Sequence, residues 1–193
     1  MGKILFLDYL VITDDRSTIT IPKNNATKLV INQDYVVPER NNRNNTKKLS
    51  GSLLNRPLQI RLLKDVEDSR YNQVLIMPIV EFNNIYDGLV LGTKAYNKTM
   101  LKKDFTYKIA PQYGLKSKAL SGSANFIYHH YNDSSRFLYK TQYVLAGSYT
   151  SYAPDLFVTS YKPSLSFHFR DTKNLRSNTR KILNFRFVSI NRD

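Results

Sequence analysis

The three histidines are the first residues in this sequence that could bind a metal or move a proton. They are His129, His130 and His168. No HExxH, HxxxH or HxH spacing places two of them for a zinc ion. His129 and His130 are adjacent, so a strand would point them to opposite faces. The chain has no Cys, which excludes a Cys-ligated zinc site and a Cys nucleophile. We therefore expect no metal or other cofactor in this chain.

Carboxylates gather in the segment KDVEDSR, where Asp65, Glu67 and Asp68 stand close together. Close carboxylates can hold a divalent cation, but this segment lacks the turn glycine of an EF-hand loop. The pattern favours ordinary solvated charge. No Ser-His-Asp arrangement, phosphate loop or nucleophile elbow is present either. The sequence therefore predicts no catalytic site in this chain.

The chain is basic, with 29 Lys and Arg against 15 Asp and Glu, a net charge of +14. Such a charge can indicate nucleic-acid binding. Here the basic residues scatter singly and cluster at Lys47–Lys48, Lys102–Lys103 and Arg170–Lys181. The last cluster lies between two strand patterns, so we interpret it as a solvated or headgroup-facing loop, with a specific anionic ligand as the alternative. Nucleic acid is not an expected partner.

The elements that position these residues are predicted to be strands. Tyr and Phe make up 12% of the chain, and long segments alternate in polarity. Because these segments follow one another directly, an antiparallel meander is expected. The predicted strands are 74–81, 89–96, 105–113, 115–131, 137–149, 155–169 and 181–190.

The first third of the chain differs in character. Ser17–Ile21 alternates strictly and Lys28–Ile31 resumes after Asn24-Asn25, which predicts a small N-terminal β-hairpin. Leucines near helical spacing in Leu58–Val66 predict one or two helical turns, although Pro57 precedes them. The predicted organisation is the end of a small β-domain at 1–36, a linker with a possible short helix at 37–72, and antiparallel strands at 73–193.

Two features favour part of a membrane β-barrel within this all-β class. Several strands exceed the roughly 9–11 residues that cross a bilayer when tilted, and their two faces are aromatic and small-hydrophilic. A soluble sandwich also alternates, so that alternative stays open. The candidate lipid-facing residues are Phe137, Tyr139, Tyr143, Leu145, Tyr149, Phe157, Tyr161, Leu165 and Phe167. The candidate lumen-facing residues are Lys140, Gln142, Ser164 and Ser166.

Whole phrases of the chain resemble a known family. They are VVPERNNRNNTKKL (36–49), NRPLQIRLLKDVEDSRYNQVLIMPIVEFNNIYDGLVLGTKAYNKT (55–99), YKIAPQYGLKSKALSGSANFIYHHY (107–131), SYAPDLF (151–157) and FRDTKNLRSNTRKILNFRFVSINRD (169–193). Together they resemble the segment downstream of the catalytic region in aminopeptidase N-like (gluzincin) zinc metallopeptidases, in an outer-membrane-associated branch from Gram-negative bacteria. The resemblance runs from about Ser17 to Asp193.

This resemblance implies a parent with a catalytic zinc domain, a small β-domain and a C-terminal membrane β-barrel. The chain would begin near the end of the small β-domain and stop inside the barrel. The family's HExxH and GAMEN-type motifs have no counterpart here, so no catalytic or metal residue is carried over, and zinc is expected in the parent alone.

The resemblance also implies an outer-membrane location, with membrane lipid and the rest of the parent chain as partners. The leading hypothesis is a non-catalytic membrane-anchoring segment. The alternatives are a freestanding basic β-protein that binds an anionic polymer or lipid headgroup, and a small pore-forming barrel.

Overall fold

A computed structural model of the 193-residue chain describes residues 4–9, 11, 17–34, 36–39, 42–51, 54–62, 67–99, 103–132, 134–135, 137–171, 174 and 177–192. Strands dominate this part of the chain, and it contains one turn of 3-10 helix and no α-helix. The predicted all-β class is therefore confirmed. Contacts divide the chain into two units, residues 1–58 with 69–72 and residues 59–68 with 73–193.

The first unit contains a short antiparallel pair of strands. β1 (Lys28–Val30) pairs with β2 (Thr46–Lys48), which follows the 3-10 turn η1 (Asn42–Asn45). Two backbone hydrogen bonds extend the pair, from Ile31 N to Asn45 O (2.8 Å) and from Leu49 N to Thr27 O (2.9 Å). The residues that we expected to be a linker therefore supply the partner of β1.

The predicted N-terminal hairpin is wrong in its partner. Ser17–Ile21 forms no strand, although the turn expected at Asn24-Asn25 is present, with positive φ angles of 40° and 61°. An isolated two-stranded hairpin is marginal in water, so alternation beside a turn does not make one by itself. The true partner is a polar segment that shows no apolar alternation.

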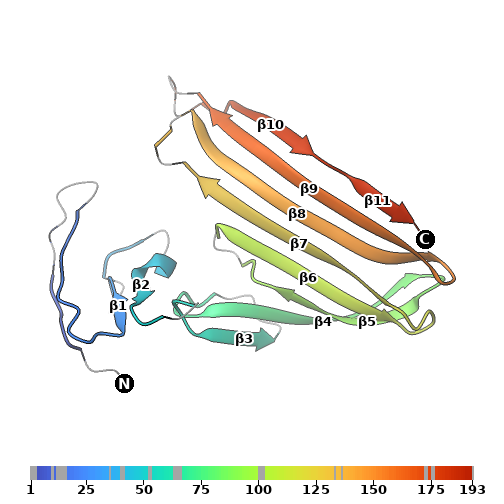
Figure 1. Ribbon diagram of the computed structural model, residues 1–193, viewed down its shortest axis with the longest axis horizontal. Coiled ribbons are helices and arrows are strands. Elements are labelled where there is room, and N and C mark those ends of the chain that lie inside the picture. Colours follow the sequence, from blue (N-terminus) through green and yellow to red (C-terminus); the bar gives the residue numbers. More distant parts are fainter. Residues whose placement is uncertain are drawn as a thin grey trace. The chain divides into compact units, whose positions relative to one another are not determined.

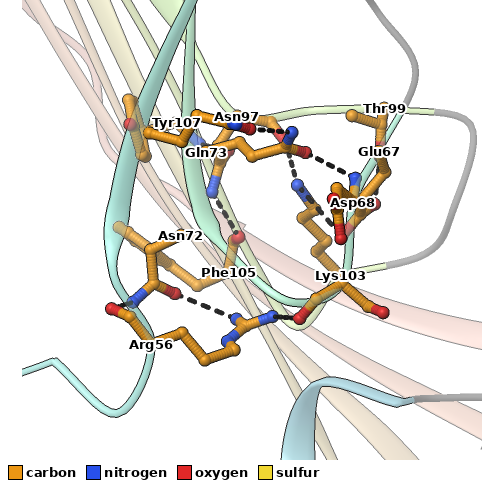
Figure 2. A network of polar contacts seen from close by, with 12 residues as sticks. Arg56, Glu67, Asp68, Asn72, Gln73, Asn97, Thr99, Lys103, Phe105 and Tyr107 are labelled. Atoms are coloured by element: carbon orange, nitrogen blue, oxygen red, sulfur yellow. Dashed lines mark hydrogen bonds and ion pairs between the residues drawn. The ribbon is translucent and has the colours of Figure 1, made fainter. Parts of the chain in front are cut away.

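Hydrogen bonds of Arg56 connect two further segments of the first unit, residues 54–58 and residues 69–72. Its guanidinium donates to Ser69 O (2.6 Å) and to Asn72 Oδ1 (2.9 Å), and Asn72 Nδ2 donates back to Arg56 O (2.8 Å) (Figure 2). Asn72 N also donates to Pro57 O (2.8 Å). These bonds join residues 54–58 to residues 69–72.

The second unit is built on one large open sheet (Figure 1). From one edge the order is β3 to β10 in sequence, and β11 pairs with β9 beside β10, so the sheet does not close on itself. All pairs from β4 onward are antiparallel, as the meander predicted. The strands are β3 (Leu58–Leu62), β4 (Asn72–Asn84), β5 (Gly88–Tyr96), β6 (Phe105–Gly114), β7 (Leu120–Tyr131), β8 (Leu138–Ala153), β9 (Leu156–Arg170), β10 (Arg180–Arg186) and β11 (Ser189–Arg192).

The predicted short helix is wrong where the structure describes it. Leu58–Leu62 is strand β3, while residues 63–66 of the predicted helix lie outside the described residues. Leu58 and Leu62 are four residues apart, a spacing that fits a helical face and also the period of two in a strand. Ile60 between them completes the strand pattern.

The connections differ between the two ends of the sheet. At one end, β4 joins β5 through 85–87, β6 joins β7 through 115–119, and β8 joins β9 through 154–155. At the other end the connections are longer, at 97–104, 132–137 and 171–179. We call these the turn end and the loop end.

At the turn end the sheet curls strongly. Asn84 Nδ2, at the end of β4, lies 3.3 Å from both the carbonyl oxygen and Oγ of Ser151 in β8, although three strands lie between them in the sheet order. Buried Asp87 sits in this contact and accepts hydrogen bonds from Asn83 (2.8 Å) and Asn84 (3.2 Å). Burial raises the pKa of Asp87, but side-chain hydrogen bonds from Ser151, Ser117, Asn83 and Asn84 outweigh it and hold the pKa below its ordinary value.

Strand β6 is approached closely from both sides near Pro111. Gly92 of β5 pairs with Gln112, and Gly122 of β7 pairs with Pro111. A Cβ on Gly122 would lie 2.5 Å from Ala110 O and 3.0 Å from Pro111 Cα, and a Cβ on Gly92 would overlap Pro111 O. Gly122 also has a φ of 153°, which L-residues rarely adopt. Both positions require glycine.

Candidate functional site: the two faces of the sheet

The strand register divides the sheet into two chemically different faces. Residues directly opposite one another in neighbouring strands lie on the same face. One row runs across five strands through Phe105, Tyr128, Tyr143, Leu165 and Phe185. We call the side that carries this row the aromatic face.

The other side is the polar face, marked by a row of polar side chains. This row runs from β7 to β10 through His129, Gln142, Ser166 and Asn184. Ser166 Oγ donates to Asn184 Oδ1 (2.9 Å). His130 lies opposite Thr141 on the aromatic face, so the two adjacent histidines do point apart, as the sequence predicts.

Most of the residues predicted to share a face do so. On β8 and β9, the aromatic face contains Tyr143, Leu145, Tyr149, Phe157, Tyr161, Leu165 and Phe167. Phe137 lies just before β8, and the centre of its ring is 4.9 Å from the ring centre of Phe169, a residue of the aromatic face. The polar face contains Lys140, Gln142, Ser164 and Ser166. On β8 and β9 the register therefore places these two sets of residues on opposite faces of the sheet.

Tyr139 is the exception, and its predicted side is wrong. A β-bulge shifts the register between Leu138 and Lys140, and a bulge sets two residues of one strand against one of its neighbour. The centre of the Tyr139 ring consequently lies 6.3 Å from the centre of the His168 ring and 5.6 Å from the guanidinium carbon of Arg170. Both of these partners lie on the polar face.

The aromatic face is exposed within the part of the chain that the structure describes. Val80 and Phe82 on β4 are each 67% exposed, and Leu120 on β7 is 68% exposed. Neighbouring rings cover one another only in part, as in the stacked pair of Tyr149 and Phe157 with ring centres 4.8 Å apart. The face offers a broad apolar surface rather than a closed core.

Burial instead concentrates on the polar face. The buried hydrophobic side chains among the described residues are Leu75, Val90 and Ala110, and the register places all three on this side. Ser121, Ser160 and Ser166 are also buried there, while Thr141 is a buried residue of the aromatic face. Side chains crowd on the concave side of a curved sheet, so this burial indicates that the sheet curls toward its polar face.

Charge follows the same division. Strands β5 to β11 contain no Asp or Glu. Lys181, opposite Phe169, is the one Lys or Arg of these strands on the aromatic face. The basic residues on the polar face are Lys94, Lys108, Lys140, Lys162, Arg170, Arg180, Arg186 and Arg192.

The acidic segment considered for cation binding has another role (Figure 2). Asp65 lies outside the described residues. Glu67 is not the solvated charge that we expected, because its side chain is 4% exposed and its Oε1 lies 3.6 Å from Lys103 Nζ. Thr99 Oγ1 also donates to Glu67 (2.5 Å). Asp68 N donates to Gln73 Oε1 (2.9 Å). These contacts connect residues 67–68 to the 97–104 connection and to the start of β4, at the loop end of the sheet.

Among the described residues, no group of three or more His, Asp or Glu side chains is arranged to hold a metal ion. The described part of the chain also lacks a helix with the length and apolar character needed to cross a membrane. No protein-family model, curated protein or solved structure matches the sequence or the fold.

Proposed function

We propose that this chain is a non-catalytic membrane-anchoring segment whose aromatic face contacts lipid. One observation carries the proposal: an exposed apolar face extends from β4 to β10 with Lys181 as its one Lys or Arg on β5 to β11. Burying apolar surface is worth about 25 cal/mol per Å². Soluble monomers rarely expose contiguous apolar patches larger than a few hundred Å². Lipid would cover this face without a protein partner.

The strands have the dimensions that such a role needs. β6, β7, β8 and β9 contain 10, 12, 16 and 15 residues, and about 9–11 residues cross a bilayer when the strand is tilted. Bacterial outer-membrane barrels also have short turns at one end and longer loops at the other. The turn end and the loop end of this sheet differ in the same way.

The open edges of the sheet support a place within a larger protein. β3 lies at one edge, and β10 and β11 at the other. Lipid cannot satisfy backbone hydrogen bonds, so a membrane-embedded sheet needs further strands to pair with both edges. In this proposal those strands come from the rest of a parent chain. Its assignment as an outer-membrane zinc aminopeptidase comes from the sequence resemblance. A reading frame that continues upstream into HExxH would support it, and a complete frame without that motif would contradict it.

Lipid contact can be measured directly, because the chain has no native Cys. Single spin labels would be attached to Tyr143→Cys and Leu145→Cys on the aromatic face, and to Gln142→Cys and Val144→Cys on the polar face. In bilayers we expect lipid-soluble oxygen to relax the first two labels. A water-soluble nickel reagent should relax the other two.

Two results would contradict the anchoring proposal. If labels on Tyr143→Cys and Leu145→Cys are protected from both reagents, the aromatic face is packed against protein and the anchoring proposal fails. If the water-soluble reagent reaches them instead, the face is open to solvent and the proposal fails in the same way. Because neighbouring residues in one strand are compared, differences in depth along the bilayer remain small.

A further inference from the structure

The loop end of the polar face brings Arg170 and Arg180 together beside the Tyr139 ring, and Lys140 lies on the same face of the neighbouring strand β8. The guanidinium carbons of Arg170 in β9 and Arg180 in β10 lie 5.6 and 6.0 Å from the centre of its ring. Lys140 follows Tyr139 in β8 and lies opposite His168. We propose that Lys140, Arg170 and Arg180 form a binding site for a soluble multivalent phosphate.

The pairing of the two arginines is the first reason to expect an anion. Arg170 and Arg180 stand directly opposite each other in the antiparallel ladder of β9 and β10. Like charges in that position repel and destabilise a sheet. Asp171 follows Arg170, so the segment holds one carboxylate against the three cations Lys140, Arg170 and Arg180. An anion that carries several charges and bridges the arginines would turn this repulsion into attraction.

The geometry of Arg180 favours phosphate. Its Nη1 donates to the carbonyl oxygens of Ser177 (2.6 Å) and Thr179 (2.8 Å). These bonds fix the planar group in place and use two of the five N–H groups of a guanidinium. Guanidinium forks match phosphate oxygens two at a time, and a Lys ammonium adds a compact point charge. Two such forks and one ammonium suit a ligand with several phosphate oxygens better than a single carboxylate.

The rest of the face indicates that the phosphate comes from solution. With Lys181 as the exception, the Lys and Arg residues of β5 to β11 lie on the same face as the cluster, and these strands hold no acidic residue. A surface lined by one sign of charge raises the local concentration of counter-ions. The polar face is also the side away from the proposed lipid contact. The choice of a soluble phosphate rests in this respect on the proposed function, whereas the cluster itself rests on the register and the contacts of the two arginines.

Calorimetric titration of the full chain with inorganic tripolyphosphate tests the site. The protein would be folded in an uncharged detergent. We expect Arg170→Gln and Arg180→Gln each to weaken binding about tenfold or more, since a hydrogen bond to a charged group is worth at least that factor. The matched control is Lys181→Gln. It removes the same charge one residue further along β10, on the opposite face, and should change the affinity less than about twofold.

Equal losses for Lys181→Gln and Arg180→Gln would mean that the phosphate responds only to net charge, and this would overturn the site. Absence of binding by the native chain would overturn it as well. Should an arginine variant fail to recover the strand signal in circular dichroism, Lys140→Gln replaces it in the comparison with Lys181→Gln. Tripolyphosphate should also raise the melting temperature of the native chain and shift that of Arg180→Gln less, because a bound ligand stabilises the folded state.

Discussion

Leu145→Arg should reduce folding of the chain into phospholipid bilayers by a factor of about 30 to 700. Leu145 lies on the aromatic face near the middle of β8, opposite Phe126 and Pro163, and is 41% exposed. An arginine on the lipid side near the bilayer centre costs about 2–4 kcal/mol, and every 1.4 kcal/mol is a tenfold change in an equilibrium constant. The measurement is the urea dependence of folding into vesicles, followed by circular dichroism.

Gln142→Arg is the matched control for this substitution. Gln142 lies three residues earlier on β8 but on the polar face, between His129 and Ser166, where an added charge keeps its contact with water. Its folding into vesicles should change little. Equal losses for the two variants would contradict the assignment of the faces.

A packed soluble sheet would also suffer from an arginine at Leu145, so lipid dependence is the second part of this test. The native chain should not melt cooperatively as a monomer in plain buffer, because its aromatic face and both sheet edges would be uncovered. A cooperative monomer in buffer that Leu145→Arg destabilises would favour the soluble alternative over the anchor.

The long strands could be predicted because alternation is a local property. The predicted segment 155–169 agrees with β9 (Leu156–Arg170) almost residue for residue, since a period of two over fifteen residues has no helical interpretation. The consecutive order then made the antiparallel meander the simplest topology. The same alternation separated Tyr143 and Leu145 from Gln142, because a strand cannot exchange its faces without a bulge.

The features that sequence reasoning missed depend on contacts distant in the chain. The bulge beside Tyr139 leaves the local polarity pattern intact, so counting in twos placed this ring on the wrong face. The Glu67 side chain is covered because Thr99 and Lys103 contact it from more than thirty residues away, and the segment KDVEDSR contains no signal for those partners. The cation cluster has a partial signal in the sequence, because Arg170–Lys181 is a basic segment, but the register that places Arg170 opposite Arg180 is a property of the sheet.

The curl of the sheet likewise cannot be predicted from the polarity pattern, and within this sheet Gly92 and Gly122 let β5 and β7 lie close to β6. Gly122→Ala should lower the free energy of unfolding by about 2–6 kcal/mol. The new Cβ would lie 2.5 Å from Ala110 O and 3.0 Å from Pro111 Cα, and overpacking of this kind costs about 1–3 kcal/mol. The φ of 153° adds backbone strain, worth of order 1–3 kcal/mol for a residue held in a sparsely populated region. Denaturant unfolding of the chain folded in detergent measures the loss.

Gly51→Ala is the control, because a Cβ at Gly51 meets nothing within 4 Å. Its unfolding free energy should stay within about 1 kcal/mol of the native value, since replacing an unstrained glycine acts mainly on the unfolded chain. If Gly122→Ala unfolds as the native chain does, β6 and β7 are not in close contact at Pro111. If it loses stability as expected, the loss should extend to the contact between Asn84 and Ser151, because that contact requires the sheet to curl across the strands between them.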